Sequence, residues 1–200
     1  MKTIELFQHD KNYNGLIAGV DEAGRGPLCG PVVCACCVMG DVFIDGINDS
    51  KKISEKKREL LFEEIINKAI AVGIAIVDEK IIDEINILNA TKKCMENAIK
   101  NLSITPDIVL IDAVKGLNIN AKTESIIKGD AKSYNIAAAS IVAKVTRDRL
   151  MKDYHEKYPV YNFIKNKGYG TAEHIKAIKE FGASPIHRKT FIKNFTNTNE

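Results

Sequence analysis

Four acidic residues stand out because each follows an apolar, strand-like run and lies at or just beyond its C-terminal end: Asp21, Glu22, Asp112 and Asp130. Carboxylates gathered at one edge of a sheet repel one another and raise one another's pKa, and a bound divalent cation removes that penalty. Hard oxygen ligands without an accompanying His or Cys cluster favour Mg²⁺ or Mn²⁺ over Zn²⁺. Two such metals can clamp the attacking and leaving oxygens of a phosphoryl transfer. The pattern therefore predicts a two-metal hydrolytic site.

Each acidic residue also has a simpler interpretation. Asp21 and Glu22 could be an exposed strand end. Asp112 could cap a helix or turn, and Asp130 could be an ordinary turn residue. Neighbours on a strand normally point to opposite faces, so Asp21 and Glu22 can both reach a metal only if the strand frays or bulges there.

The first acidic pair is followed by a segment rich in glycine and proline. An apolar run at 16–20 ends in the pair, and the residues that follow forbid helix and most regular strand: Gly24, Gly26, Pro27, Gly30 and Pro31. No Gly-Lys-Ser/Thr follows, so the segment is not a Walker phosphate loop, and it does not match the Gly-x-Gly-x-x-Gly dinucleotide motif. Charges before such a turn are typical of a scaffold that presents groups to a ligand.

The sequence at 21–32, Asp-Glu-Ala-Gly-Arg-Gly-Pro-Leu-Cys-Gly-Pro-Val, resembles the first motif of the type 2 ribonucleases H, bacterial ribonuclease HII in particular. The resemblance runs from about residue 15 to 191 and includes a closing motif at 185–191. Arg25 between two glycines favours ribonuclease HII over ribonuclease HIII, which usually has Lys there. The resemblance implies that Asp21, Glu22, Asp112 and Asp130 are catalytic and bind metal.

The resemblance also implies a set of substrate-binding residues. An enzyme that cuts RNA paired with DNA must sense the 2′-OH, and glycines at 24 and 26 would let the backbone approach a sugar. In the family, the segment matched by Gly24, Arg25 and Gly26 reads the ribonucleotide, and the tyrosine matched by Tyr169 senses the following deoxyribose. Lys51 and Lys144 are assigned to phosphate or structural roles.

The activity implied is that of an endoribonuclease that uses Mg²⁺ or Mn²⁺ in a two-metal site. It would hydrolyse the RNA strand of RNA–DNA hybrids and incise at ribonucleotides embedded in duplex DNA, leaving a 3′-OH and a 5′-phosphate. A monomer is expected. Two alternatives stay open, namely a non-catalytic protein that binds RNA–DNA hybrids and a metal-dependent phosphatase or nucleotide hydrolase.

Hydrophobic periodicity predicts an α/β fold with a mixed sheet. Strands are expected at 16–20, 32–39, 42–44, 71–77 and 107–112, with a short extended piece at 123–127. Helices are expected at 55–69, capped by Ser54, at about 89–102 with a weak start near 83, at 134–154 and at 172–181. The strands at 71–77 and 107–112 should run parallel, because a helix joins them.

The resemblance implies a ribonuclease H-like, five-stranded mixed sheet flanked by helices. We expect residues 1–158 to form the catalytic core and 159–200 a small, helical, substrate-binding appendage, integrated into one domain of about 15–200. Within the helix at 134–154, the uncharged stretch 136–143 should be buried nearly all round. The charged second half should be partly exposed.

Composition points to an ordinary soluble protein. Hydrophobic residues make 45% of the chain and charged residues 28%, and no apolar run approaches the roughly 18 residues of a membrane span. The five cysteines lack paired Cys-x-x-Cys spacing and are expected to be buried free thiols, so a cytoplasmic location without membrane contact is expected.

Basic residues are concentrated near the C-terminus. Residues 151–200 carry nine Lys/Arg and five Asp/Glu, a net +4, whereas residues 1–150 carry 20 and 21, a net −1. This distribution suits the binding of a polyanion over metal-binding carboxylates.

If about four of these cations contact phosphates, the logarithm of duplex affinity should fall with the logarithm of salt concentration at a slope of about −3 to −4. A salt titration that gives a flat response would remove the basic segment from the interface.

Overall fold

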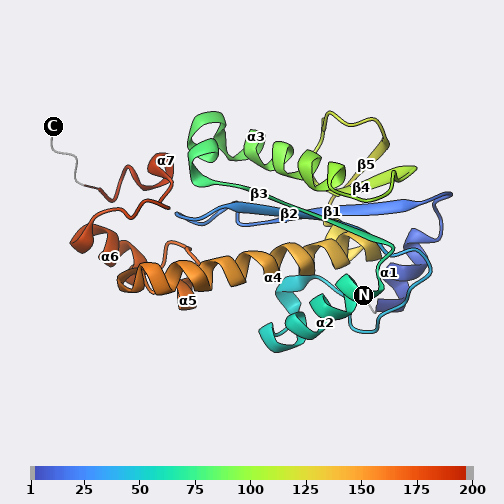
Figure 1. Cartoon of the computed structure of the whole chain (residues 1–200), viewed down its shortest axis with the longest axis horizontal. Coiled ribbons are helices and arrows are strands. Elements are labelled where there is room, and N and C mark those ends of the chain that lie inside the picture. The colour runs from blue at the N-terminus through green and yellow to red at the C-terminus, as the bar shows by residue number, and fades with distance from the viewer. Residues whose placement is uncertain (1–2, 197–200) are drawn as a thin grey trace.

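The computed structural model describes residues 3–196, and its centre is one mixed sheet of five strands (Figure 1). The strands are β1 (Ile17–Ala23), β2 (Val32–Val38), β3 (Ala71–Val77), β4 (Ile108–Asp112) and β5 (Lys122–Ile126), in the spatial order β3-β2-β1-β4-β5. β2 is antiparallel to β1 and β3, whereas β4 is parallel to β1 and β5. The predicted five-stranded mixed sheet is confirmed, and β3 and β4 run parallel with β2 and β1 between them.

One predicted strand is wrong. Residues 42–44 are irregular and lie between two turns, and the fifth strand is β5, which was expected only as a short extended piece. Gly40 has a φ of +60° and begins the turn, so the chain leaves the sheet before Phe43. The side chains of Phe43 and Tyr134 stack with ring centroids 6.2 Å apart, so apolar packing rather than strand pairing accounts for this run.

The helices match the predicted pattern with two differences. They are α1 (Thr3–Asp10), α2 (Glu55–Lys68), α3 (Glu79–Lys100), α4 (Tyr134–Lys157), α5 (Phe163–Asn166), α6 (Ala172–Phe181) and α7 (Lys189–Ile192). α1 and the short helices α5 and α7 were not expected. α3 begins earlier than expected because the Asp78 side chain caps it by accepting from the Ile81 N–H, and Asn86, at φ +66°, interrupts it.

The sheet separates two apolar cores, and β2 contributes to both because its side chains alternate. Cys34 and Cys36 pack with α3 residues in one core, and Cys37 packs with α4 residues in the other. α3 and α4 accordingly cover opposite faces of the sheet (Figure 1). All five cysteines are buried and free, so the expectation for the thiols is confirmed.

Helix α4 lies close against β1 at its N-terminal end. A Cβ on Gly19 would lie 2.2 Å from the backbone of Asn135 and Ile136, so only glycine permits this approach. All residues from Tyr134 to Ala143 are buried, as expected from their lack of charge. The second half is more buried than expected, because Arg147 is 1% and Asp148 is 6% exposed.

The C-terminal segment folds onto the end of α4 and the glycine-rich loop. Its apolar residues, including Phe163, Ile178 and Ile186, form a small core with Cys29 and Met151. The division into a core of 1–158 and an appendage of 159–200 stays a prediction, and residues 197–200 lie outside the described chain. No helix within residues 3–196 is long and apolar enough to cross a membrane.

The close approach at Gly19 generates a prediction for stability. Gly19→Ala should lower the free energy of unfolding by at least about 1–3 kcal/mol, because the new methyl group overlaps the backbone of α4. Urea denaturation measures this change. Gly26→Ala is the control, since its Cβ would lie 3.6 Å from Tyr169 Cε1, an ordinary contact, and should change stability by no more than about 0.5 kcal/mol. Equal stability of the Gly19 variant and the wild type would contradict the packing described here.

Candidate metal centre and nucleic-acid site

Three carboxylates from separate segments converge near the ends of β1 and β4. Asp21 lies in β1, Asp112 is the last residue of β4, and Asp130 lies in a 3₁₀ turn, Gly129–Ala131. One oxygen from each lies within 4.8 Å of the others. The geometry brings together residues separated by up to 109 positions in the sequence (130 − 21).

The sheet register and one backbone hydrogen bond produce this convergence. Val20 and Ile111 are partners in the parallel pairing of β1 with β4, so Asp21 and Asp112 occupy the next position on adjacent strands. The Gly129 N–H donates to Asp112 Oδ1 at 2.6 Å and holds the turn against the end of β4. The turn thereby places Asp130 beside the other two carboxylates.

The three carboxylates lie in a position that is unfavourable for their charge. Burial raises the pKa of Asp21 well above its usual value, and the charges of Glu22 and Asp112 raise it further. Burial also raises the pKa of Asp130, with added repulsion from Asp49 and Asp112. A cluster that raises its own pKa values in this way is a candidate for a cation or a catalytic proton.

Glu22 lies beside this group, not in it. The expected fraying or bulge of the strand is absent, since β1 pairs regularly with β2 through Ala23, and Asp21 and Glu22 both lie inside the strand. Glu22 Oε1 is 3.4 Å from Arg25 Nη1. Glu22 Oε2 is buried and has no hydrogen-bond partner among the described residues. Burial raises the pKa of Glu22, and Arg25 partly opposes that shift.

This donor set fits a hard divalent cation. Asp21, Asp112 and Asp130 supply oxygen donors within a few ångströms of one another, and Glu22 adds a buried oxygen that lacks a partner in the described part of the chain. Carboxylate oxygens without nitrogen or sulfur donors match the preferences of Mg²⁺ and Mn²⁺. A bound cation would offset the repulsion that raises the pKa of Asp21.

A pocket next to the carboxylates contains all six residues that were expected to bind substrate. Its lining comes from β1, the loop after it, the 3₁₀ turn Ser50–Lys52, α4 and the loop before α6. The lining residues are Glu22, Ala23, Gly24, Arg25, Gly26, Ser50, Lys51, Lys144, Arg147 and Tyr169. The pocket is thus assembled from four distant stretches of the chain.

The two glycines beside Arg25 serve different purposes. Gly24 is buried with a φ of +99°, and a Cβ there would lie 2.1 Å from Arg147 Nε, so its missing side chain makes room for α4. Gly26 is exposed, and its absent side chain would point toward the ring of Tyr169. Packing against Arg147 therefore requires glycine at 24, and the contact of either glycine with a sugar stays a prediction.

Tyr169 is 47% exposed on a loop that two buried histidines hold in place. His174 Nδ1 lies 2.9 Å from the Tyr169 carbonyl oxygen, and His174 Nε2 lies 3.0 Å from His187 Nε2. Because a carbonyl only accepts, His174 carries its proton on Nδ1 and accepts from the His187 Nε2–H. Burial lowers the pKa of both histidines, that of His187 to about 4, so the pair is neutral at pH 7.

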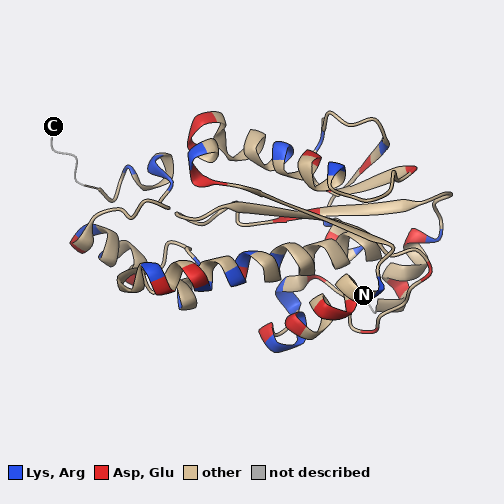
Figure 2. Cartoon of the chain, in the orientation of Figure 1, with Lys and Arg blue, Asp and Glu red and all other residues tan. Residues whose placement is uncertain are grey.

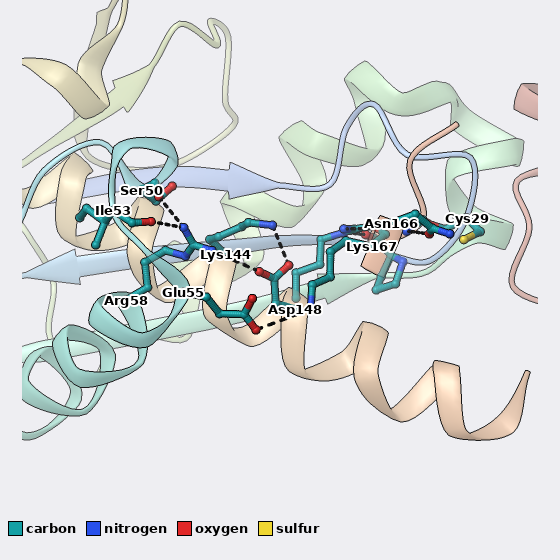
Figure 3. Close-up of polar contacts among 12 residues, drawn as sticks. Cys29, Ser50, Ile53, Glu55, Arg58, Lys144, Asp148, Asn166 and Lys167 are labelled. Atoms are coloured by element: carbon teal, nitrogen blue, oxygen red, sulfur yellow. Dashed lines mark hydrogen bonds and ion pairs between the residues drawn. The ribbon is translucent and has the colours of Figure 1, made fainter. Parts of the chain in front are cut away.

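The two lysines of the pocket differ in their surroundings. Burial tends to lower the pKa of Lys51, but the carboxylates of Asp130 and Asp21 raise it overall, so its ammonium group is charged and faces the acidic cluster. Lys144 donates to Asp148 Oδ1 at 2.7 Å, and Arg58 approaches the other oxygen of Asp148 at 3.8 Å (Figure 3). Lys144 is therefore held by a partly buried ion pair.

Sequence reasoning missed two contributors to this region. Asp49, for which the sequence generated no prediction, adds a further carboxylate next to Asp130. Arg147, treated as a charge on a partly exposed helix face, is buried behind Gly24. The signal for Arg147 was its helical spacing, because it follows the buried Ala143 by four residues and so lies on the same face of α4.

Charged residues of both signs lie along α4 and the C-terminal helices (Figure 2). Of the cations in the C-terminal segment, Arg188 is fully buried, whereas Lys165, Lys176 and Lys189 are exposed. Only the exposed cations are available to phosphates. The excess positive charge expected from sequence is thus partly internal.

Comparison with known proteins agrees with this geometry. A family model described as ribonuclease HII matches residues 18–195. This chain belongs to the ribonuclease HII family. The ribonuclease HII of Acetivibrio thermocellus is 63% identical over 192 residues, which cover 96% of this chain and 75% of that protein. The ribonuclease HII of Bacillus subtilis is 53% identical over 192 residues, covering 96% and 74%.

Solved structures of the family have the same fold. The ribonuclease H2 of Pyrococcus horikoshii OT3 matches with a TM-score of 0.76 and 29% identity, covering 91% of this chain and 99% of that one. The RNase HII of Archaeoglobus fulgidus, solved in complex with PCNA, matches with a TM-score of 0.71 and 27% identity, covering 86% and 93%. The chain is a metal-dependent ribonuclease H that acts on RNA in RNA–DNA hybrids, as the resemblance implied.

Repulsion within the carboxylate cluster predicts how the stability of the metal-free ribonuclease depends on pH. The folded state raises the pKa of Asp21, so between the unfolded and folded values the folded state binds more protons, and stability falls as pH rises through this range. Asp21→Asn should remove this loss and raise the Tm of the metal-free protein, by about 2–4 °C for each 1 kcal/mol recovered.

Thermal unfolding at pH 7, in EDTA and in Mn²⁺, measures both effects. Mn²⁺ should raise the Tm of the wild-type protein, and it should raise the Tm of Asp21→Asn by a smaller amount. Asp153→Asn, at an exposed position of α4, is the control and should behave as wild type. A lower Tm for Asp21→Asn in EDTA would contradict the repulsion described here.

Proposed function

We propose that this ribonuclease incises duplex DNA at embedded ribonucleotides, as well as hydrolysing RNA in hybrids, by a two-metal mechanism that leaves a 3′-OH and a 5′-phosphate. The observation that carries the proposal is the junction of the two sites. Glu22 lies beside the carboxylate cluster and also lines the pocket that contains Gly26 and Tyr169. A phosphate at the cluster and a sugar in the pocket would thus be neighbours.

We assign the four carboxylates to holding Mg²⁺ or Mn²⁺. Asp21, Asp112 and Asp130 form the converging set. Glu22 lies close enough for its charge to interact with those of Asp21 and Asp112, and its Oε2 has no hydrogen-bond partner among the described residues. When bound, two such ions supply an activated water and a stabilised leaving oxygen. Lys51, whose charge is stabilised by the cluster, is suited to contact the phosphate that approaches it.

The pocket is assigned to the sugars on either side of the cut. A single ribonucleotide differs from its neighbours only by the 2′-OH, so backbone groups at residues 24–26 must come close to it. Tyr169 lies against Gly26 and is half-exposed, which supports assigning its ring to stack on the next deoxyribose. Lys144 is assigned a structural role through Asp148.

Incision of a DNA duplex that contains one ribonucleotide tests the proposal. With Mg²⁺ or Mn²⁺ the protein should cut at the ribonucleotide, and removal of either ion with EDTA should stop cleavage. Asp21→Asn and Asp112→Asn should each reduce the rate of incision by about 100-fold or more. Each removes a carboxylate that would hold the metal ions, and these ions stabilise the charge of the transition state. Asp153→Asn should retain the wild-type rate.

Other outcomes separate the alternatives. Intact duplex in every metal, together with tight binding, would favour a non-catalytic hybrid-binding protein. Hydrolysis of mononucleotides without any cleavage of duplexes would favour a phosphatase or nucleotide hydrolase. Cleavage of long hybrids with no incision at a single ribonucleotide would overturn the proposed specificity.

A further inference from the structure

The closing motif of the sequence, residues 185–191, contains a buried arginine that the carboxylate site does not explain. Arg188 is 0% exposed. Within residues 3–196, no carboxylate lies within 4.0 Å of its guanidinium nitrogens, and its hydrogen bonds go to backbone carbonyls instead. Burying an unpaired charge is costly, which indicates that this side chain does more than fill space.

The guanidinium group of Arg188 donates its hydrogen bonds to backbone carbonyls of the glycine-rich loop. Nη2 donates to the Gly24 oxygen at 2.6 Å, and Nη1 donates to the Arg25 oxygen at 2.9 Å. Nε and Nη2 both donate to the Gly30 oxygen, at 3.0 and 2.8 Å. One side chain thus fixes the direction of two successive carbonyls in the loop that lines the pocket.

The direction of these carbonyls determines the direction of two amides. The carbonyl of Gly24 shares a peptide unit with the N–H of Arg25, and the carbonyl of Arg25 shares one with the N–H of Gly26. In a planar trans peptide the C=O and N–H point in opposite directions, so both amides point away from Arg188. Neither amide donates a hydrogen bond within the described chain, and both residues are exposed at the pocket.

We propose that Arg188 is a positioning residue for ribose recognition, which holds the Gly24 and Arg25 peptide planes so that the amides of Arg25 and Gly26 face the 2′-oxygen of the substrate. The inference rests on the proposed function of the pocket. A charged donor on each carbonyl also polarises the peptide and makes its amide a stronger donor. Arg188 therefore sets both the direction and the strength of the two donors.

A second buried arginine holds the other end of the same loop. Arg147 donates to the carbonyl oxygens of Pro31 at 3.0 Å and Cys29 at 3.2 Å. It also donates to the Lys167 oxygen at 3.0 Å, and the region of Cys29 and Lys167 is shown in Figure 3. Arg147 thus joins this loop to the one that carries Tyr169. Within residues 3–196, Arg147 makes no hydrogen bond to the carbonyls of Gly24 or Arg25, and Arg188 is the side chain that donates to both.

Selective binding tests the proposal. In EDTA, where the duplex is not cut, wild type should bind a duplex with one ribonucleotide more tightly than the all-DNA duplex of the same sequence. Arg188→Lys keeps a positive charge but loses the planar fork, so this preference should fall by about tenfold or more while affinity for the all-DNA duplex stays the same. The Mn²⁺-induced rise in Tm should also persist, because the carboxylates are not altered.

The matched control is Ile178→Ala, which weakens the C-terminal core and leaves the hydrogen-bonding side chain of Arg188 in place. It should lower the Tm and keep the wild-type preference. Preference retained in Arg188→Lys, or lost equally in Ile178→Ala, would overturn the inference while leaving the proposed function intact. A wild-type protein without preference would instead overturn the proposed function, and the inference with it.

Amide hydrogen exchange in the wild-type protein does not depend on the folding of any variant. The amides of Arg25 and Gly26 should exchange rapidly in the free protein, because they face the open pocket. They should become protected by the ribonucleotide-containing duplex and remain unprotected with all-DNA duplex. Slow exchange of both amides in the free protein would contradict the peptide orientation.

Discussion

Repulsion among buried carboxylates is the constraint on which the rest of this structure depends. Asp21, Asp112 and Asp130 lie close together with a raised pKa at Asp21 and Asp130. Stability alone does not favour such an arrangement, so the parallel pairing of β1 with β4 and the turn at Gly129 must supply it. The apolar cores on both faces of the sheet provide the free energy that keeps the charges in place.

The strand that carries the first carboxylate, β1, leads directly into the glycine-rich loop at residues 24–31, which lines the pocket. β1 places Asp21 in the cluster, and Glu22 lies between the cluster and the pocket. Gly24 then packs against the side chain of Arg147, and the loop continues to β2. Hydrogen bonds from Arg188 to its carbonyl oxygens hold the loop in place. A few residues of one segment therefore join the carboxylate cluster to the pocket that the proposed function assigns to the sugar.

Sequence patterns predicted most of the helices and strands, and they identified the candidate site residues by their types. α2, α6 and four strands follow from periodicity and capping, and the resemblance supplied the carboxylates. The strand expected at 42–44 failed because an apolar run packs equally well in irregular structure. The roles of Gly24, Arg147 and Arg188 could not be predicted, because each depends on contacts between residues more than 100 positions apart.

A crystal soaked in Mn²⁺, with anomalous scattering recorded, tests the central claim most directly. The account predicts two manganese peaks about 3.5–4 Å apart, coordinated by oxygens of Asp21, Asp112 and Asp130, with Glu22 turned toward one of them. Manganese bound elsewhere, or no peak at a concentration that supports cleavage, would contradict it.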